Sequence, residues 1–264
     1  MRIREKLIVA LDVDRLEEAK AIALKLQPYA GAFKIGMQLF TSQGPRVVEE
    51  IQQLGCRVFV DLKFHDIPNT VAQAGRVLTR LETFMFNVHA AGGREMMRRT
   101  VEAVHEEADR RGLIPPIILA VTVLTSISPR QWREEIGGQR GLAEQVIHLA
   151  RLAQESGLNG VVASPQEVAD IRRACGPDFL VVTPGVRPAW GELNDQQRVM
   201  TPAAALRAGA SYLVIGRPIL EASDPVEACQ RIVAEMKAST NNFDEKGNEC
   251  EPGDFESRSS CRHV

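Results

Sequence analysis

The sequence has few cysteines, no long apolar run and almost no excess of charge of one sign. Its five cysteines are odd in number and scattered, without Cys-x-x-Cys or zinc-site spacing (Cys56, Cys175, Cys229, Cys250 and Cys261). A reducing cytoplasm is therefore the simplest compartment for the chain. Two of the five lie in a polar C-terminal segment, and we expect no function for them.

No apolar run approaches the length that a membrane-spanning helix needs. Residues Met1–Lys6 are charged and lead directly into a strand, without the apolar segment and cleavage site of a secretory signal. The formal net charge of −2 gives no reason to expect nucleic acid or a membrane as a partner. We therefore expect a cytoplasmic protein that binds neither, while a local basic site for a small phosphate remains open.

What the sequence does contain is a repeated unit of a strand followed by a helix. With 264 residues, 44% hydrophobic and 25% charged, the chain suits one large α/β domain or two small ones. Short apolar runs predict strands at residues 7–13, 32–37, 57–63, 84–90, 117–124, 160–164, 180–186 and 211–216. Helical patterns follow them at residues 14–27, 42–54, 68–80, 92–111, 165–175 and 202–208, with two further helices ending near residues 156 and 237.

Eight strand–helix units predict an α/β fold of the (β/α)8 TIM barrel type at residues 1–238. Alternation of strands and helices does not show closure, so a doubly wound open sheet is the alternative. The count of eight, and the lack of Gly-x-Gly-x-x-Gly after the first strand, favour the barrel. Residues 239–264 are polar and almost free of aliphatic side chains, so we expect a disordered tail there.

The stretch Asp61–Thr70 concentrates charge at the end of the third predicted strand. Because side chains alternate along a strand, Asp61 and Lys63 are expected on one face, with Asp66 just beyond. Two carboxylates around one ammonium favour the charged form of Lys63, which suits a proton donor and not a Schiff-base nucleophile. Asp-x-Lys-x-x-Asp is also short enough to be ordinary surface charge, with Asp66 capping the helix that Pro68 begins.

A second cation, Lys34, lies inside the second predicted strand between two apolar residues. A lysine in a buried strand is costly unless it is paired, and its expected partners are Asp12 and Asp61 on the neighbouring strands. An isolated surface pair would contribute little, so a charged array inside a barrel mouth requires a functional explanation. The alternative for Asp12 is a helix cap, a role for which Asp14 competes.

Other polar residues also follow the strands. His89 ends the fourth strand and is interpreted as a core histidine more readily than as a site residue. His65 lies in the charged stretch and could line the site or support loop packing. Thr125 follows the fifth strand, where its hydroxyl could bond a ligand or start the next turn.

The loops after the last two strands predict a phosphate site, which is their usual role in this fold. They contain Arg187 and Arg217, whose planar guanidinium groups suit phosphate. Gly216 lets the backbone approach an anion, and the amides that open the following helix would point at it. The long polar loop 188–200, which contains Gln196, has the length of a lid.

Together these residues resemble the orotidine 5′-phosphate decarboxylase family, of the bacterial type, over nearly the whole chain except the tail. The matching blocks are Ala10–Asp12, Phe33–Gly36, Asp61–Thr70, Ala120–Ser126, Thr183–Pro188 and Ile215–Pro218. The resemblance implies a catalytic array of alternating charge formed by Lys34, Asp61, Lys63 and Asp66. It also implies a homodimer in which Asp66 and Thr70 come from the other subunit. The substrate-binding positions that it implies are Lys34, Asp61, Thr70, Asp12 for the ribose, Thr125 for the pyrimidine, Pro184, and Arg187, Gln196, Gly216 and Arg217 for the phosphate.

The reaction that the resemblance implies is decarboxylation of orotidine 5′-phosphate to uridine 5′-phosphate and carbon dioxide, in de novo pyrimidine biosynthesis. Lys63 would stabilise the charge left at ring carbon C6 and then donate the proton. Related sugar-phosphate enzymes share Asp-x-Lys-x-x-Asp but hold magnesium near the end of strand 2, where this chain has Lys34. We therefore expect no metal and no cofactor. The rival classes are a magnesium-dependent sugar-phosphate decarboxylase or aldolase, and a non-catalytic nucleotide-binding barrel.

Overall fold

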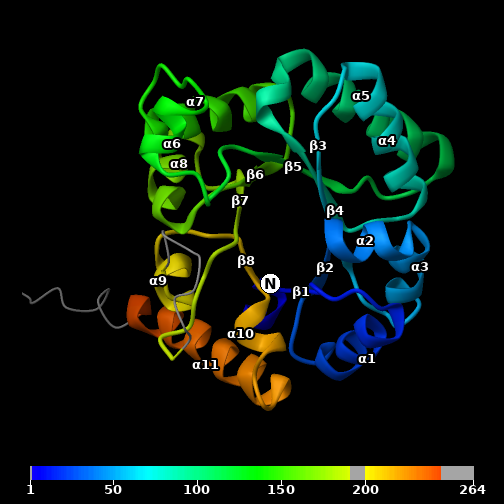
Figure 1. Ribbon diagram of the computed structural model, residues 1–264, viewed down its shortest axis with the longest axis vertical. Coiled ribbons are helices and arrows are strands. Elements are labelled where there is room, and N and C mark those ends of the chain that lie inside the picture. Colours follow the sequence, from blue (N-terminus) through cyan, green and yellow to red (C-terminus); the bar gives the residue numbers. More distant parts are fainter. Residues whose placement is uncertain (1, 191–199, 245–264) are drawn as a thin grey trace, which may run out of the picture.

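A closed barrel of parallel strands lies at the centre of the molecule, and helices surround it (Figure 1). The computed structural model describes residues 2–190 and 200–244. In this part of the chain the strands are β1 (Leu7–Ala10), β2 (Ala32–Gly36), β3 (Val58–Phe64), β4 (Met85–His89), β5 (Ile117–Val121), β6 (Gly160–Val162), β7 (Leu180–Thr183) and β8 (Tyr212–Ile215). Each strand pairs with the next in sequence.

The barrel closes because β1 also pairs with β8, through Ile8 opposite Val214 and Val9 opposite Ile215. An open doubly wound sheet would leave two edge strands, so this pairing excludes it. The (β/α)8 TIM barrel predicted from the sequence is confirmed.

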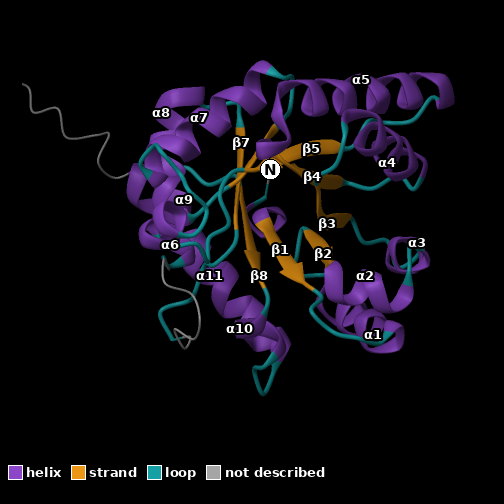
Figure 2. Ribbon diagram, turned by 45° about the horizontal axis from the view of Figure 1, so that its top comes forward, coloured by secondary structure: helices purple, strands orange, loops and turns teal. Residues whose placement is uncertain are grey.

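The helices lie outside the strands in both views of the ribbon (Figures 1 and 2). They are α1 (Leu16–Leu26), α2 (Met37–Gln43), α3 (Arg46–Gln52), α4 (Pro68–Arg80), α5 (Gly93–Arg111), α6 (Pro129–Glu134), α7 (Leu142–Glu155), α8 (Val168–Cys175), α9 (Pro202–Arg207), α10 (Arg217–Leu220) and α11 (Pro225–Asp244). Short 3-10 turns precede β1, α5 and α8, at η1 (Ile3–Lys6), η2 (Ala90–Gly92) and η3 (Pro165–Glu167).

Two helices that the sequence predicted as single are each divided. The predicted helix at residues 42–54 is interrupted at Gly44, which has a φ of +69° and is followed by Pro45. The helix after β8 is likewise divided into α10 and α11, because Pro225 cannot continue a helix and the Asp224 carboxylate instead accepts a bond from the Val226 amide at 2.9 Å.

Several strands are shorter than their apolar patterns predicted. β5 ends at Val121 and β7 at Thr183, yet Val123 and Val186 beyond them are 5% and 0% exposed. Buried loop residues thus extend the apolar pattern past the hydrogen-bonded ladder. At the other end of the chain, α11 continues to Asp244, into the segment predicted as tail, because no glycine or proline interrupts it there. The rest of that predicted tail lies outside the described residues.

Alternating side chains divide the core into two layers. One layer lies between the barrel and its helices and contains Val58 and Val60. The other fills the barrel interior, with members that include Ile8, Ala32, Phe59, Met85, Leu119, Val182 and Val214. Inward-facing positions further along the same strands therefore line the mouth of the barrel.

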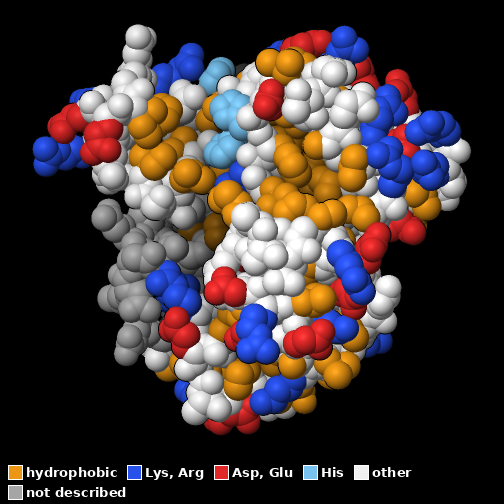
Figure 3. Space-filling model, turned by 45° about the vertical axis from the view of Figure 1, so that its right-hand side comes forward, with side chains coloured by type: hydrophobic (Ala, Val, Ile, Leu, Met, Phe, Trp, Pro, Cys, Tyr) orange, Lys and Arg blue, Asp and Glu red, His pale blue; other side chains and the backbone are white. Residues whose placement is uncertain are grey.

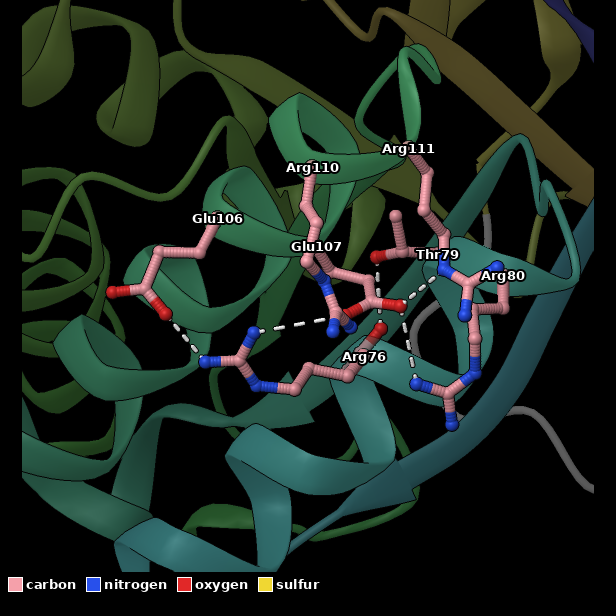
Figure 4. Close-up of polar contacts among 8 residues, drawn as sticks. Arg76, Thr79, Arg80, Glu106, Glu107, Arg110 and Arg111 are labelled. Carbon is pink, nitrogen blue, oxygen red and sulfur yellow. Dashed lines mark hydrogen bonds and ion pairs between the residues drawn. The ribbon is translucent and has the colours of Figure 1, made fainter.

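Helices α4 and α5 pack side by side and are joined by an ion cluster around Glu107 (Figure 4). This carboxylate is fully buried and is contacted by Arg111 at 2.6 Å, Arg80 at 3.2 Å and Arg76 at 3.7 Å, as well as by Arg110. The arginine bonds, with that of Arg111 the largest, lower the pKa of Glu107 to about 2 although burial opposes this. The cluster thereby holds α4, the helix that follows β3, against α5.

Candidate active site

The polar residues predicted from the sequence meet at the inner face of the strand ends. Lys34 follows the inward Ala32 by two residues, and Asp61 and Lys63 follow the inward Phe59 by two and four. They line a cavity of about 170 Å³ with Phe59, Val121, Val123, Leu124, Thr125, Val162, Pro184 and Val214. Pockets for drug-sized ligands are roughly 300–1,000 Å³, so this cavity suits one ring of a ligand whose remainder extends over the strand ends.

Four charged groups form a chain across the cavity mouth. Lys63 Nζ lies 2.7 Å from Asp61 Oδ1, and Lys34 Nζ lies 3.5 Å from Asp61 Oδ2 and 3.1 Å from Asp12 Oδ1. The side chains of Lys34 and Asp61 are only 12% and 13% exposed. The pairing of Lys34 with both aspartates is as the sequence predicted, and it satisfies a cation that the barrel interior would otherwise exclude.

Asp61 stays ionised in this arrangement. Burial by itself would raise its pKa, but the charges of Lys34 and Lys63, with hydrogen bonds from Lys63 and Asn87, outweigh burial and lower the pKa below the ordinary value. The site therefore keeps a fixed anion between two cations.

Sequence reasoning missed one residue of the site, Asn87. It is fully buried on β4, donates from Nδ2 to Asp61 Oδ1 at 2.7 Å, and accepts the Lys63 amide proton on Oδ1 at 2.8 Å. Lys63 has a φ of +53°, a left-handed conformation that costs a residue with a side chain about 1–2 kcal/mol. The signal in the sequence is an amide inside the apolar run Phe84–Val88, since a buried amide requires partners as a buried lysine does.

Asp66 and Thr70 do not join the cluster within one chain. Both are exposed, and among the described residues no ion pair links Asp66 to Lys34 or Lys63. Asp66 Oδ1 instead accepts the Ile67 amide proton at 2.6 Å, close to the start of α4. The expectation that Asp66 flanks Lys63 is therefore not met inside a single subunit.

The predicted phosphate residues lie around the ends of β7 and β8. Arg187 is 7% exposed, and its amide donates to Met200 O at 3.0 Å across an isolated bridge. Arg217 is the first residue of α10, directly after Gly216. A Cβ atom at Gly216 would lie 3.1 Å from Asp12 Oδ2, so a larger residue would crowd the carboxylate. Gln196 lies outside the described residues.

His65 and His89 lie beside the charged chain, with ring centroids 5.4 Å apart. Burial is the main cause that lowers the pKa of His89, and His65 and Lys63 add to it. His89 is half-buried, and it does not line the cavity described above.

Comparison with known proteins assigns the chain to a family. The sequence matches the family described as "Orotidine 5'-phosphate decarboxylase / HUMPS family" over residues 5–232. The chain belongs to this family. The resemblance inferred from the sequence motifs is thereby confirmed, and so is the enzyme class, since the relatives carry the name of a decarboxylase.

The relatives and solved structures of the decarboxylase / HUMPS family cover almost the whole barrel. Orotidine 5'-phosphate decarboxylase of Syntrophomonas wolfei is 59% identical over 239 residues, which are 90% of this chain and all of that protein. The enzyme of the same name from Moorella thermoacetica is 55% identical over 90% of this chain and 94% of its own length. The crystal structure of orotidine 5'-phosphate decarboxylase from Lactobacillus acidophilus has a TM-score of 0.77 and 41% identity, covering 87% of this chain and 98% of its own.

Two further observations describe the same part of the chain. No helix among the described residues is both long and apolar enough to cross a membrane. Within these residues, no group of three or more His, Cys, Asp or Glu side chains is arranged to hold a metal ion.

Proposed function

We propose that the protein decarboxylates orotidine 5′-phosphate to uridine 5′-phosphate and carbon dioxide in pyrimidine biosynthesis, with Lys63 as the catalytic cation. The observation that carries this is the Lys63 ammonium, held 2.7 Å from Asp61 at the wall of a ring-sized cavity. Family membership and the named relatives support the substrate. Cys56, Cys175 and Cys229 are buried free thiols, which supports a reducing cytoplasm as the proposed compartment.

The chemistry requires a cation at one carbon of the substrate ring. Loss of the carboxylate leaves an electron pair at C6 in an orbital that cannot conjugate with the ring carbonyls. Lys63 stabilises that charge and then delivers a proton to C6, while Asp61 fixes the ammonium and repels the departing carboxylate. At about 4 Å and an effective dielectric near 20, one such charge pair contributes on the order of 4 kcal/mol.

That contribution is well below the roughly 8–23 kcal/mol of enzymatic rate enhancements. Binding of the remote phosphate must therefore contribute through orientation and exclusion of water. The residues that we propose to bind the phosphate are Arg187, Gln196, Gly216 and Arg217. Asp12 would contact the ribose, and Thr125 and Pro184 would contact the pyrimidine. This orientation of the substrate is supported by the cavity lining, in which Thr125 and Pro184 lie together with Lys63.

The proposed enzyme acts as a homodimer in which Asp66 and Thr70 complete the partner's site. Both residues are exposed beside Ile67, whose large apolar side chain is 67% exposed, and Met37 at the start of α2 is 57% exposed. Figure 3 shows the side of the molecule on which α2 to α5 lie, and a broad hydrophobic area is exposed there. Exposed apolar areas of this kind commonly mark protein interfaces.

The charge pattern favours this reaction over magnesium-dependent chemistry on a sugar phosphate. The Lys34 ammonium lies between Asp12 and Asp61, 3.1 Å and 3.5 Å from their nearest oxygens, where it would repel a divalent cation. The proposed reaction therefore uses no divalent metal at this position, and we also propose that it needs no cofactor. A chelator should leave turnover unchanged, whereas the magnesium-dependent alternative predicts that activity is lost.

The direct test follows the ultraviolet absorbance of orotidine 5′-phosphate with the purified protein and with Lys63→Ala. We expect turnover by the wild type and a loss of more than about 10⁴-fold in kcat for the variant, because it lacks both the cation and the proton. The variant should still bind uridine 5′-phosphate. A wild type that binds this nucleotide without consuming orotidine 5′-phosphate would instead be a non-catalytic binding protein, and near-normal turnover by the variant would refute the role of Lys63.

A further inference from the structure

The geometry points to Asn87 as a positioning residue that holds Lys63 and Asp61 in their reactive arrangement. Its amide contacts the two residues that the proposed function makes central, through the Lys63 backbone and the Asp61 side chain. This inference rests on the proposed function and adds a residue that neither the sequence motifs nor the relatives' names identify.

The first support is a break in the pairing of β3 with β4. Val60 lies opposite Phe86 and Phe64 lies opposite Val88, so the three residues 61–63 lie opposite Asn87 alone. A bulge of this kind leaves a backbone amide without its ladder acceptor. The Asn87 side chain replaces that acceptor, because its Oδ1 takes the Lys63 amide proton at 2.8 Å.

The second support is the closed path that Asn87 completes. Its Nδ2 donates to the same Asp61 oxygen that binds Lys63 Nζ, and both of these distances are 2.7 Å. The orientation of the amide is fixed by chemistry, since a backbone N–H can only donate and a carboxylate can only accept. Backbone, amide, carboxylate and ammonium thus form one ring of contacts that begins and ends at Lys63.

The third support is the burial and conformation of the residues concerned. Asn87 is fully buried, so no water competes for its amide. Lys63 is held at a φ of +53°, which a residue with a side chain adopts only when its surroundings impose it. Without Asn87 the Lys63 backbone is free to relax toward the strand conformation, and its ammonium then moves away from the position where C6 would lie.

The test compares the wild type with Asn87→Ala, Asn87→Asp and a control for the loss of a side-chain-to-backbone bond, Asn159→Ala, at an exposed asparagine. Asn159 also accepts a backbone amide proton on its side chain, from Ile118 at 2.7 Å, but it precedes β6 at the opposite rim of the barrel. For each protein, kcat and KM for orotidine 5′-phosphate and the Kd for uridine 5′-phosphate are measured from pH 5 to 9. Thermal midpoints report on folding.

We expect Asn87→Ala to lower kcat about 10²-fold, the effect of misplacing a reacting group by about 1 Å, with KM and Kd changed less than about threefold. Asn159→Ala should keep the wild-type kcat. Asn87→Asp keeps the acceptor for Lys63 but removes the donor to Asp61, so its activity relative to wild type should rise on acidification, when the new carboxyl group gains a proton to donate. The titratable groups around this position (Asp61, Lys63, Lys34 and His89) are present in both proteins, so a pH dependence of this ratio arises from the substitution and its coupling to them.

Three results would overturn the inference. One is a wild-type kcat in Asn87→Ala, and another is an equal loss in Asn159→Ala, which would indicate a general effect on the barrel. The third is a flat pH ratio for Asn87→Asp, which also decides the matter if Asn87→Ala does not fold. A wild type without any turnover of orotidine 5′-phosphate would refute the proposed function itself, and the four proteins distinguish that failure from the others.

Discussion

Asp61 keeps its charge in the barrel interior because two lysines and two hydrogen bonds outweigh burial. A carboxylate in an apolar site would normally bind a proton, and the reversed direction of its pKa shift is a property of the cluster. Since the folded state lowers this pKa, the cluster stabilises the protein above the ordinary carboxyl pKa and loses that stabilisation as the pH falls through the lowered value. Asp61 is therefore ionised at neutral pH.

At the same residue scale, Arg217 tests the phosphate site. Arg217→Ala should lower kcat/KM for orotidine 5′-phosphate by about 10- to 100-fold, because charge-assisted bonds to phosphate are each worth about 1.5–3 kcal/mol. Arg217→Lys should retain part of the activity, since it keeps the charge but not the planar fork. Arg207, an exposed arginine at the end of α9, provides the control, and its replacement by Ala should leave kcat/KM unchanged. An unaltered kcat/KM in Arg217→Ala would show that Arg217 does not bind the phosphate.

At the scale of elements, the α4–α5 pair depends on Glu107. Its pKa in the folded protein is about 2, against 4.5 for an unperturbed glutamate, so the ion cluster stabilises the fold above about pH 4.5. As the pH falls from there toward 2, the carboxylate gains a proton and this stabilisation is lost. The arginines of α4 would then lose the anion that joins them to α5.

The urea midpoint of unfolding of Glu107→Gln should therefore be lower than that of the wild type at pH 7. At pH 3 the difference between the two midpoints should be smaller. Glu106→Gln is the matched control, because Glu106 lies next to it on α5 but is 65% exposed and pairs with Arg76 alone among the described residues. Exposed pairs contribute about 0–1 kcal/mol, so we expect little change in the control. Equal midpoints for wild type and Glu107→Gln at pH 7 would show that the cluster does not stabilise the helix pair.

At the scale of the whole molecule, the proposed dimer makes a prediction that a single chain cannot satisfy. Lys63→Ala and Asp66→Asn should each be nearly inactive alone. When they are mixed and exchange subunits, half of the dimers become mixed, and each mixed dimer has one site with both residues intact. About a quarter of the wild-type activity should then return, as follows from random pairing in a two-fold dimer.

If both variants are inactive alone, activity that stays absent after demonstrated subunit exchange would show that Asp66 acts within its own chain. Sedimentation of the wild type provides the accompanying control, because the complementation argument requires a dimer in solution. A monomer with full activity would contradict both the shared site and the proposed role of the exposed apolar area near Ile67.

The sequence by itself determined the eight strand–helix units and the residues that face inward. Strand periodicity is local, so Phe59, Asp61 and Lys63 on one face followed from spacing alone, and Lys34 inside an apolar run required partners. Both expectations are met by the cavity and its ion pairs. Helix breaks were harder to predict, since Gly44 decides one of them through a single dihedral angle.

Only the tertiary structure decided what lies opposite each residue. The closure of β1 on β8, the bulge at residues 61–63 and the contact of Asn87 with both Lys63 and Asp61 depend on pairing between strands. Closure and stagger of the strands are properties of the whole barrel, and no single strand fixes them. The chain thus specifies which side chains point into the mouth, while the fold specifies which of them touch.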